Sequence, residues 1–212
     1  MELEKLYNIN LYQGDCMDLM RQYPDKYFDL AIVDPPYGIN VNVSMGRRKG
    51  DKKSNYHKFA GGDSSIPDKK YFDELLRISN NQIIWGGNYM TEYLKPSPCW
   101  ILWDKLFSEY VTFAQFEMAW TSFKSSSKKI EISPNQIDRI HPTQKPVQLY
   151  KWLLQKYAKE GDKILDTHFG SLSIGIACHD LHFELTASEL DKEYYELGKN
   201  RLIWHQKQLN IF

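Results

Sequence analysis

The chain has 212 residues, 42% of them apolar, and carries 27 basic and 27 acidic side chains, so its formal net charge is zero. This length and apolar content predict a single domain, 1–212, with its own hydrophobic core. A zero net charge excludes a uniformly basic surface, so any nucleic-acid contact must come from a local patch. The three cysteines lie far apart and lack metal-ligand spacing, which favours reduced thiols in a cytoplasmic protein. We expect no metal site, signal peptide or membrane segment.

The N-terminal part has the pattern of a β-α-β unit. Ile9–Gln13 alternates between apolar and polar residues and predicts a strand, which Gly14 ends. Asp15 is a suitable N-cap for a helix over residues 16–22. The apolar run Phe28–Val33 predicts a second strand, buried on both faces and parallel to the first through a right-handed crossover.

Asp34-Pro35-Pro36-Tyr37 follows directly after this second strand. The two prolines cannot continue a strand ladder and fix two φ angles, so the chain is stiff where the strand stops. In open α/β sheets, ligands bind at this end of a strand. The group suits a planar exocyclic amine, because Asp34 and the Pro35 carbonyl can each accept one N–H while Tyr37 stacks on the ring. The alternative is a proline-terminated strand followed by an ordinary loop.

Residues 39–65 lack periodicity and are too many for a plain connection in a compact domain. We therefore expect a mobile basic loop. Its basic cluster lies close to the Asp34 motif in the sequence, which predicts phosphate contacts, and a solvated surface loop is the alternative. The cluster consists of Arg47, Arg48, Lys49, Lys52 and Lys53.

The middle of the chain predicts one helix and three strands. Ile66-Pro67 opens the helix, and Asn81–Trp85, Cys99–Asp104 and Phe113–Thr121 predict the strands. No convincing helix separates the last two strands, so the last one is expected to be antiparallel. After the first of them, Asn88 either binds a purine edge as donor and acceptor or caps a glycine turn.

The last third alternates between helices and strands. The patterns predict a helix over residues 144–158 with Thr143 as N-cap, strands at Lys163–Asp166 and Phe183–Ser188, and a terminal helix from Asp191 to Gln208. The two strands flank a small-residue turn and a helix that starts near Ile174. The whole pattern is α/β, with about seven strands.

The turn between these two strands suits an adenosine. Asp166–Ser173 combines a strand end, a glycine turn and a helix N-terminus, and Glu189 follows about twenty residues later at the next strand end. The turn lets the backbone approach a ligand, and the distal carboxylate can accept ribose hydroxyls. Because the second glycine of a dinucleotide fingerprint is missing, a plain β-α-β corner is the alternative.

Together these two constellations resemble the β group of the N6-adenine/N4-cytosine DNA methyltransferases, in which the catalytic motif precedes the cofactor loop. Asp34–Tyr37 resembles the catalytic tetrapeptide, Asp166–Ser171 the cofactor loop, and Glu189 the ribose-binding acid. Asp15 matches a family residue near the cofactor adenine. Thr143–Pro146 resembles the helix start that packs over the methionine end of the cofactor. The resemblance covers nearly the whole chain.

The resemblance implies a Rossmann-like, circularly permuted α/β fold: a seven-stranded, mostly parallel sheet with helices on both faces and one antiparallel strand near an edge. It implies a site-specific DNA methyltransferase of a restriction-modification system, which transfers a methyl group from S-adenosylmethionine to the N6 amine of a flipped adenine. Catalysis would fall to Asp34, Pro35, Pro36 and Tyr37, and DNA binding to the basic cluster and Asn88. The cofactor would contact Asp15, Cys16, Thr143, Gln144, Lys145, Asp166, His168, Phe169, Gly170, Ser171, Ser173, Glu189 and Asp191.

Two features depart from the family pattern. Thr167-His168 and Leu172 stand where most relatives carry Pro-Phe and a glycine, and Leu172 is expected to weaken cofactor binding. We interpret His168 as a wall of the pocket, because methyl transfer has no obvious need for a catalytic base. Residues 123–140 form only a short insert in place of a target-recognition domain. Recognition of the DNA target sequence must then depend on the loop 39–65, on this insert, or on a second copy or separate specificity subunit.

Other functions stay open at this stage. RNA or protein-amide methylation is one, but those families more often carry Asn at the position of Asp34. A non-catalytic or partner-dependent DNA-binding module is another, favoured by Leu172 and opposed by the intact tetrapeptide. In the resembled family an Asp first residue usually accompanies adenine and a Ser first residue cytosine, so N6-adenine is preferred over N4-cytosine.

Neutral replacement of the five basic residues of the loop should flatten the salt dependence of DNA binding. Each phosphate contact that is lost lowers the slope of log K against log salt by about 0.9. Titrations of a labelled duplex over a salt series measure this slope. An unchanged slope would show that the cluster makes no phosphate contacts.

Overall fold

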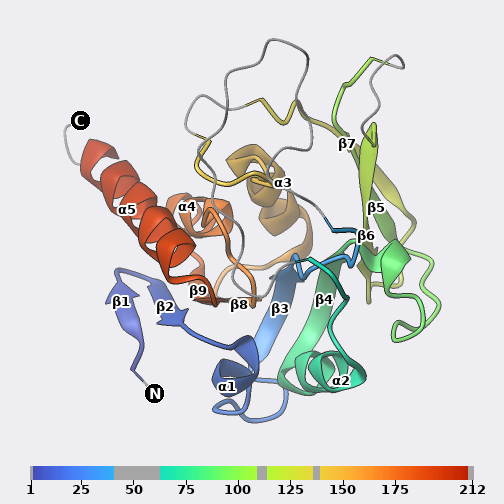
Figure 1. Cartoon of the computed structure of the whole chain (residues 1–212), viewed down its shortest axis with the longest axis horizontal. Coiled ribbons are helices and arrows are strands. Elements are labelled where there is room, and N and C mark those ends of the chain that lie inside the picture. The colour runs from blue at the N-terminus through green and yellow to red at the C-terminus, as the bar shows by residue number, and fades with distance from the viewer. Residues whose placement is uncertain (1, 41–62, 109–113, 136–138, 210–212) are drawn as a thin grey trace.

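Figure 1 shows the computed structural model, which describes residues 2–40, 63–108, 114–135 and 139–209. Within these residues one sheet has the strand order β1-β2-β9-β8-β3-β4-β6-β5-β7. The strands are β1 (Glu4–Leu6), β2 (Ile9–Gln13), β3 (Phe28–Val33), β4 (Ser79–Trp85), β5 (Trp100–Asp104), β6 (Phe116–Thr121), β7 (Lys128–Glu131), β8 (Lys163–Asp166) and β9 (Glu184–Glu189). The helices are α1 (Cys16–Met20), α2 (Lys69–Ile78), α3 (Val147–Tyr157), α4 (Ser173–Asp180) and α5 (Lys192–Leu209), with a 3-10 turn η1 (Gly87–Tyr89).

Most of the sheet is parallel. β2, β9, β8, β3 and β4 pair in parallel, as do β5 and β7. β6 runs antiparallel to both β4 and β5, and β1 runs antiparallel to β2. The α/β class is confirmed, but the described sheet has nine strands. The sequence analysis missed β1 and β7 because these edge strands are short and carry no run of buried apolar residues. The antiparallel β6 was expected, but it lies between β4 and β5.

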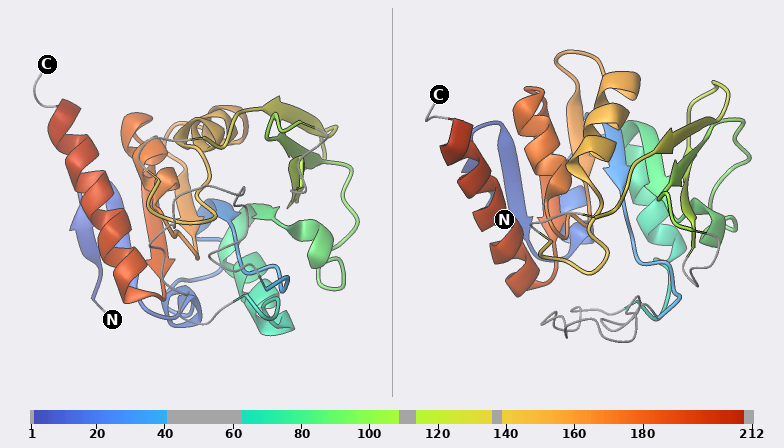
Figure 2. Two further views of the ribbon diagram at one scale, coloured as in Figure 1. Left: turned by 45° about the horizontal axis from the view of Figure 1, so that its top comes forward. Right: turned by 90° about the horizontal axis from the view of Figure 1, so that it is seen from above.

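Helices cover both faces of the sheet, as Figure 2 shows. β3 is buried on both faces because its side chains alternate between two cores. Leu30 and Ile32 join the core beneath α3, α4 and α5, whereas Ala31 and Val33 join the core beneath α1 and α2. This double burial explains why the sequence of β3 is a continuous apolar run.

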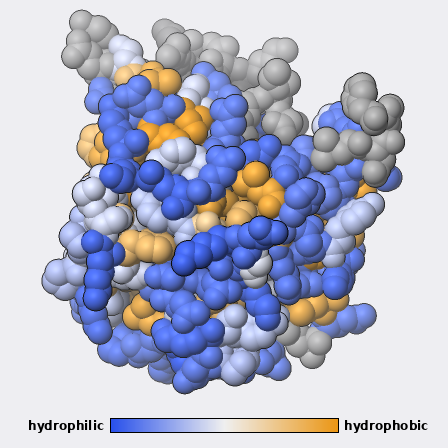
Figure 3. All heavy atoms as spheres, turned by 180° about the vertical axis from the view of Figure 1, so that it is seen from behind, coloured by the Kyte–Doolittle hydropathy of each residue, from blue (hydrophilic) through white to orange (hydrophobic). Residues whose placement is uncertain are grey.

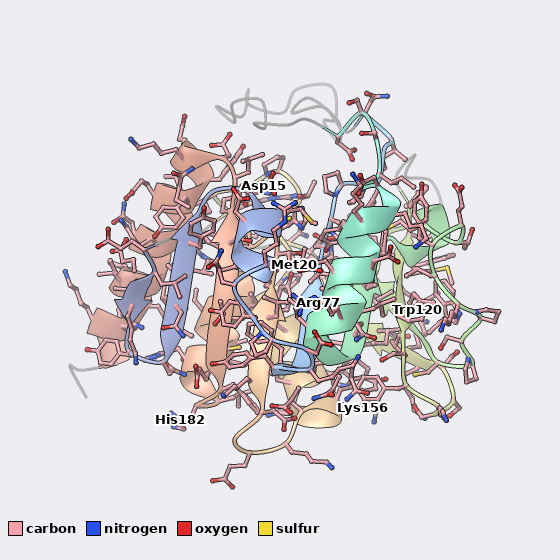
Figure 4. The ribbon with its side chains drawn as sticks, turned by 90° about the horizontal axis from the view of Figure 1, so that it is seen from below. Asp15, Met20, Arg77, Trp120, Lys156 and His182 are labelled. Carbon is pink, nitrogen blue, oxygen red and sulfur yellow. The ribbon has the colours of Figure 1, made fainter. Side chains whose placement is uncertain are left out.

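Arg77 ties α2 to the segment that follows α1, on the face seen in Figure 4. Its guanidinium donates to the backbone carbonyls of Met20 and Tyr23, at 3.4 and 2.9 Å, and pairs with Asp25 at 2.7 Å. These contacts engage backbone carbonyls at the end of α1 and just beyond it. They hold α1 and α2 together beside β3.

The start of α3 differs from the prediction. The helix begins at Val147 with Pro146 in the N-cap position, so the expected start at residue 144 and the expected N-cap Thr143 are wrong. Proline disfavours helical backbone at the residue before it, so Lys145 cannot belong to the helix. The Thr143 hydroxyl instead forms a hydrogen bond with His141 Nδ1 at 3.1 Å.

Leu172 begins α4 in the left-handed conformation, with φ 55° and ψ 32°. The side chain is fully buried and occupies space that two glycines leave open. A Cβ atom at Gly175 would lie 2.6 Å from Leu172 Cγ, and one at Gly198 would lie 3.2 Å from Leu172 Cβ. The leucine at the place of the family glycine is therefore part of the packing between α4 and α5.

Leu172→Gly should lower the free energy of unfolding by about 2 kcal/mol, the difference between the midpoints of two opposing effects. The loss of a buried leucine costs about 2–5 kcal/mol, whereas relief of the left-handed strain returns only about 1–2 kcal/mol. His182→Gly is the matched control, because His182 also has a positive φ of 61° but an exposed side chain. Urea unfolding should find this control within about 1 kcal/mol of the wild type. A Leu172→Gly protein as stable as the wild type would contradict the packing argument.

Candidate active site

The carboxyl ends of β2, β3, β4, β8 and β9 meet at one edge of the sheet, because these strands run in parallel. The two constellations found in the sequence therefore come together there. Asp34 follows β3, and Asp166 ends the neighbouring strand β8. Glu189 ends β9, the next strand along, and Asp15 follows β2.

Both carboxylate oxygens of Asp34 are engaged. The Tyr37 hydroxyl donates to Oδ1 at 2.6 Å, and Lys145 Nζ donates to Oδ2 at 2.6 Å. The sequence analysis assigned Lys145 to the cofactor, and the structure places its ammonium on Asp34. Lys145 also pairs with Glu117 of β6 at 3.0 Å. These contacts form a largely buried polar cluster around the tetrapeptide Asp34–Tyr37.

Tyr37 is fixed from several sides. Asp63 Oδ1 accepts hydrogen bonds from the backbone N–H groups of Tyr37 and Gly38, at 2.7 and 2.9 Å. Gly86 lies so close that a Cβ there would be 2.2 Å from Tyr37 Cε1, and its φ of 67° also favours glycine. The Tyr89 ring stacks on Tyr37 at 5.5 Å between centroids and is 46% exposed. The two tyrosines thus form an aromatic surface at this edge.

The ends of the segment 41–62 lie beside this tetrapeptide. Asn40 donates its N–H to the Asp63 carbonyl at 2.8 Å, so the residues before and after the segment are paired. The five predicted phosphate-contacting residues, Arg47, Arg48, Lys49, Lys52 and Lys53, lie outside the described residues. Asn88 is exposed on η1, next to Tyr89.

On the neighbouring strand β8, Asp166 is 1% exposed and accepts the His168 N–H at 3.0 Å. Burial, with the charges of Asp34 and Glu189, raises the pKa of Asp166 to about 8. Burial also lowers the pKa of His168 to about 4, so its ring is neutral at pH 7. The Thr167 hydroxyl lies 2.9 Å from His168 Nδ1 and 2.7 Å from the Tyr71 hydroxyl. Two of the three residues that depart from the family pattern, Thr167 and His168, therefore share one hydrogen-bonded chain.

Glu189 joins the glycine turn to the start of α5. Its Oε2 accepts the Gly170 N–H at 2.9 Å, and its Oε1 accepts the Asp191 N–H at 2.9 Å. Burial raises the pKa of Glu189. Asp191 itself accepts the N–H groups of Glu193 and Tyr194, at 2.9 and 3.1 Å, and so caps α5. The two acids predicted at this strand end thus have different local roles.

The remaining predicted residues surround the same turn. His141 lies beside Gly170, since a Cβ at Gly170 would be 3.5 Å from His141 Nε2, and this brings the Thr143-Gln144 turn against the predicted cofactor loop. Gln144 is buried and accepts the Ile140 N–H at 3.0 Å. Phe169 is buried against α5. Ser171 and Ser173 form a hydrogen bond of 3.1 Å.

Asp15 and Cys16 lie at the start of α1. Asp15 caps this helix by accepting the Met17 N–H at 2.8 Å. Burial, with the charge of Asp15, raises the pKa of the Cys16 thiol to about 12. The thiol is therefore protonated at pH 7, and only its neutral form is available for contacts.

Several residues of the site were missed by the sequence analysis. Glu117 lies on the antiparallel strand β6, and its partner Lys105 follows β5 directly. Arg201 of α5 donates to the Ser171 carbonyl and to Ser173 Oγ, each at 3.0 Å. No motif marks these residues. Tyr89 had a signal, since it follows the predicted turn Gly86-Gly87-Asn88 directly.

Two expected absences concern the described residues only. Among them, no cluster of three His, Cys, Asp or Glu residues has the geometry to hold a metal ion. No helix in the same ranges has the length and apolar character needed to cross a membrane.

The face turned away from the viewer of Figure 1 is mostly hydrophilic, with hydrophobic side chains in separate patches (Figure 3).

Curated proteins with similar sequences extend over most of the chain. The type II methyltransferase M2.DpnII of Streptococcus pneumoniae is 30% identical over 254 residues, which cover 92% of this chain and 91% of that protein. The type II methyltransferase M2.MboI of Moraxella bovis is 26% identical over 238 residues, covering 92% of this chain and 87% of that protein.

Solved structures share the fold at low identity. The PvuII DNA methyltransferase (cytosine-N4-specific) superposes with a TM-score of 0.65 at 13% identity, covering 92% of this chain and 86% of its own. The complex of M1.HpyAVI with SAM gives a TM-score of 0.58 at 18% identity, covering 91% and 99%. A family model described as DNA methylase, for N6 and N4 methyltransferases, matches residues 84–200, more than half of the chain. The chain therefore belongs to the N6-adenine/N4-cytosine DNA methyltransferase family.

Proposed function

We propose that this DNA methyltransferase modifies the N6 amine of adenine, with Asp34 and the Pro35 carbonyl as acceptors of the amine N–H groups. The observation that carries the proposal is the position of Asp34. It follows β3 at the edge where the predicted cofactor loop follows the adjacent strand β8. A base inside a duplex cannot reach this edge, so the adenine must leave the stack. Tyr37 and Tyr89 offer the aromatic surface on which it would rest.

The methyl donor is S-adenosylmethionine, the cofactor of this family, which supplies a methyl group on a sulfonium. The residues at the ends of β8 and β9 fit this group. Asp166 and Glu189 are acids whose pKa burial raises, and a cationic ligand favours their ionised forms. The glycine turn at Gly170 lets the backbone come close, and Glu189 suits the ribose hydroxyls.

The catalytic residues would act mainly by position. An amine conjugated with a purine ring is a poor nucleophile, because its lone pair is delocalised. Asp34 is an acceptor-only group when ionised, and its ion pair with Lys145 supports this role toward the amine. Its hydrogen bond orients the nitrogen and returns electron density to it. The rigid Pro35-Pro36 segment holds the acceptors in place. The entropy cost of orienting them is therefore met on folding and does not add to the activation barrier.

The choice of adenine rests on Asp34 as the first residue of the tetrapeptide. The solved PvuII enzyme, whose title gives cytosine-N4 as its target, shares the fold, so the fold alone supports either base. We also propose that the DNA target sequence is recognised by the loop 39–65, by the insert 123–140 or by a partner subunit. β7 lies within that insert and forms an edge of the sheet.

Purified protein should form N6-methyladenine in DNA, detected by mass spectrometry of the nucleosides after digestion. Asp34→Ala should lower the rate by about 10²–10³, because a preorganised acceptor is lost, and should leave cofactor affinity nearly unchanged. Asp73→Asn is the matched control, since Asp73 forms an exposed ion pair with Lys69 on α2. N4-methylcytosine as the sole product would overturn the choice of base. Wild-type turnover by Asp34→Ala would overturn the site.

Glu189→Ala should weaken the binding of S-adenosylmethionine by about 1.5–3 kcal/mol, through the loss of charge-assisted hydrogen bonds to the ribose. Isothermal titration measures this change. Glu184→Ala is the matched control, because Glu184 is exposed at the opposite end of β9. An unchanged dissociation constant for Glu189→Ala would assign ribose binding to another acid.

A further inference from the structure

Glu117 reaches the catalytic edge because β6 runs against its neighbours. β6 starts at the edge where β3 and β4 end, and Glu117 is its second residue. The register places Glu117 opposite Trp103 near the end of β5, and Lys105 follows β5 directly. An antiparallel strand thus contributes a carboxylate to a site that otherwise comes from parallel strand ends.

Glu117 lies between two ammonium groups. Its Oε1 is 2.5 Å from Lys105 Nζ, and its Oε2 is 3.0 Å from Lys145 Nζ. Lys145 Nζ also donates to Asp34 Oδ2 at 2.6 Å and to the Tyr37 hydroxyl at 3.3 Å. The three donors of the ammonium therefore have three acceptors. Two carboxylates and two ammonium groups balance each other in charge.

Two indole rings pack against the same ammonium groups. Lys145 Nζ lies 5.2 Å from the Trp85 ring centroid, and Lys105 Nζ lies 5.5 Å from that of Trp103. The two rings meet edge to face, with centroids 6.2 Å apart. Cation–π attraction adds to the ion pairs at this range. Each lysine is therefore held both by an indole ring of the sheet and by the Glu117 carboxylate.

Stability alone does not account for this arrangement. Asp34 by itself neutralises Lys145, and the side chain of Lys145 is only 3% exposed. A second, partly buried carboxylate adds desolvation cost and needs a further cation, here Lys105, to balance it. Buried ion pairs of this kind are often no more stabilising than apolar side chains of the same volume. The geometry instead restricts where the Lys145 ammonium can lie.

We infer that Glu117 is a positioning residue, which together with Lys105 holds the Lys145 ammonium against Asp34 and so fixes the direction in which Asp34 faces the target amine. The inference rests on the proposed role of Asp34 in methyl transfer. Glu117 touches neither the amine nor the cofactor in this scheme. It acts through Lys145, and Lys105 acts through Glu117.

The charges around Lys145 give the inference a consequence that does not need DNA. Burial lowers the pKa of Lys145, but the charges of Asp34 and Glu117 outweigh burial and raise it. Tyr37 contacts the ammonium directly, and Asp166 of β8 also acts on it. Tyr150 of α3 faces the same carboxylates. Loss of the Glu117 charge should therefore lower the pKa of Lys145.

The first experiment compares the kinetics of Glu117→Gln, Lys105→Met and the double variant with those of the wild type. Glu117→Gln should lower kcat by about 10–100-fold, because a misplacement on the order of 1 Å at the reacting group has effects of this size. The KM for S-adenosylmethionine should stay unchanged. The double variant should lose no more than Glu117→Gln alone, since Lys105 acts through Glu117. Glu131→Gln is the matched control, because the Glu131 carboxylate of the wild type forms an ion pair with Lys129 on β7.

Lys105→Arg keeps the charge and should retain activity where Lys105→Met loses it. This comparison also decides the matter if Glu117→Gln fails to fold. Additive losses in the double variant, or wild-type kcat in Glu117→Gln, would overturn the inference. A raised cofactor KM without a change in kcat would equally overturn it, by assigning Glu117 to cofactor binding.

The second experiment follows the lysine side-chain signals of the free protein by NMR between about pH 8 and 12, because no reagent then has to reach the buried Lys145. Lys145 should titrate at a lower pH in Glu117→Gln than in the wild type, with the exposed Lys70 as the internal reference. An unchanged titration of Lys145 would overturn the link between Glu117 and Lys145. If the wild type methylates no DNA, the proposed function fails, and this titration still tests the link by itself.

Discussion

The ion pair between Lys145 and Asp34 joins two parts of the chain that are 111 residues apart. Lys145 is nearly fully buried, and a buried ammonium is costly unless acceptors surround it. The tetrapeptide after β3, the turn before α3 and the hairpin of β5 and β6 each supply part of that surrounding. The arrangement of this edge of the sheet therefore depends on their mutual placement, because a shift of any of these segments would remove partners from a buried charge cluster.

The directions of the strands explain what else lies at this edge. Parallel strands bring Asp34, Asp166 and Glu189 together at their carboxyl ends. The reversal of β6 adds Glu117 from a strand beginning, which no rule about strand ends would select. The tight turn at Gly86, after β4, leaves room for the Tyr37 ring. The sheet topology thus brings the proposed amine acceptors and the proposed cofactor-binding residues side by side at one edge.

The departures from the family pattern are compensated locally. Leu172 adopts a strained backbone, but Gly175 and Gly198 leave room for its side chain in the core. Thr167 and His168 replace an apolar pair with polar side chains, and the Tyr71 hydroxyl from α2 completes their hydrogen-bonded chain. Buried polar groups are tolerated when they are paired in this way. The predicted cofactor loop therefore accommodates these departures through its own packing and hydrogen bonds.

The sequence by itself determined the α/β class, the permuted motif order and the family, because buried strands, proline stops and glycine turns have local signatures. It located Asp34, Asp166 and Glu189 at strand ends, since each closes a predicted strand, apolar before Asp34 and Asp166 and mixed before Glu189. Only the tertiary structure decided that Lys145 pairs with Asp34 and that Glu117 and Lys105 join them. Those contacts depend on the register and direction of β6 and on the path of the chain before α3. Such long-range relations leave no periodic pattern in the residues that make them.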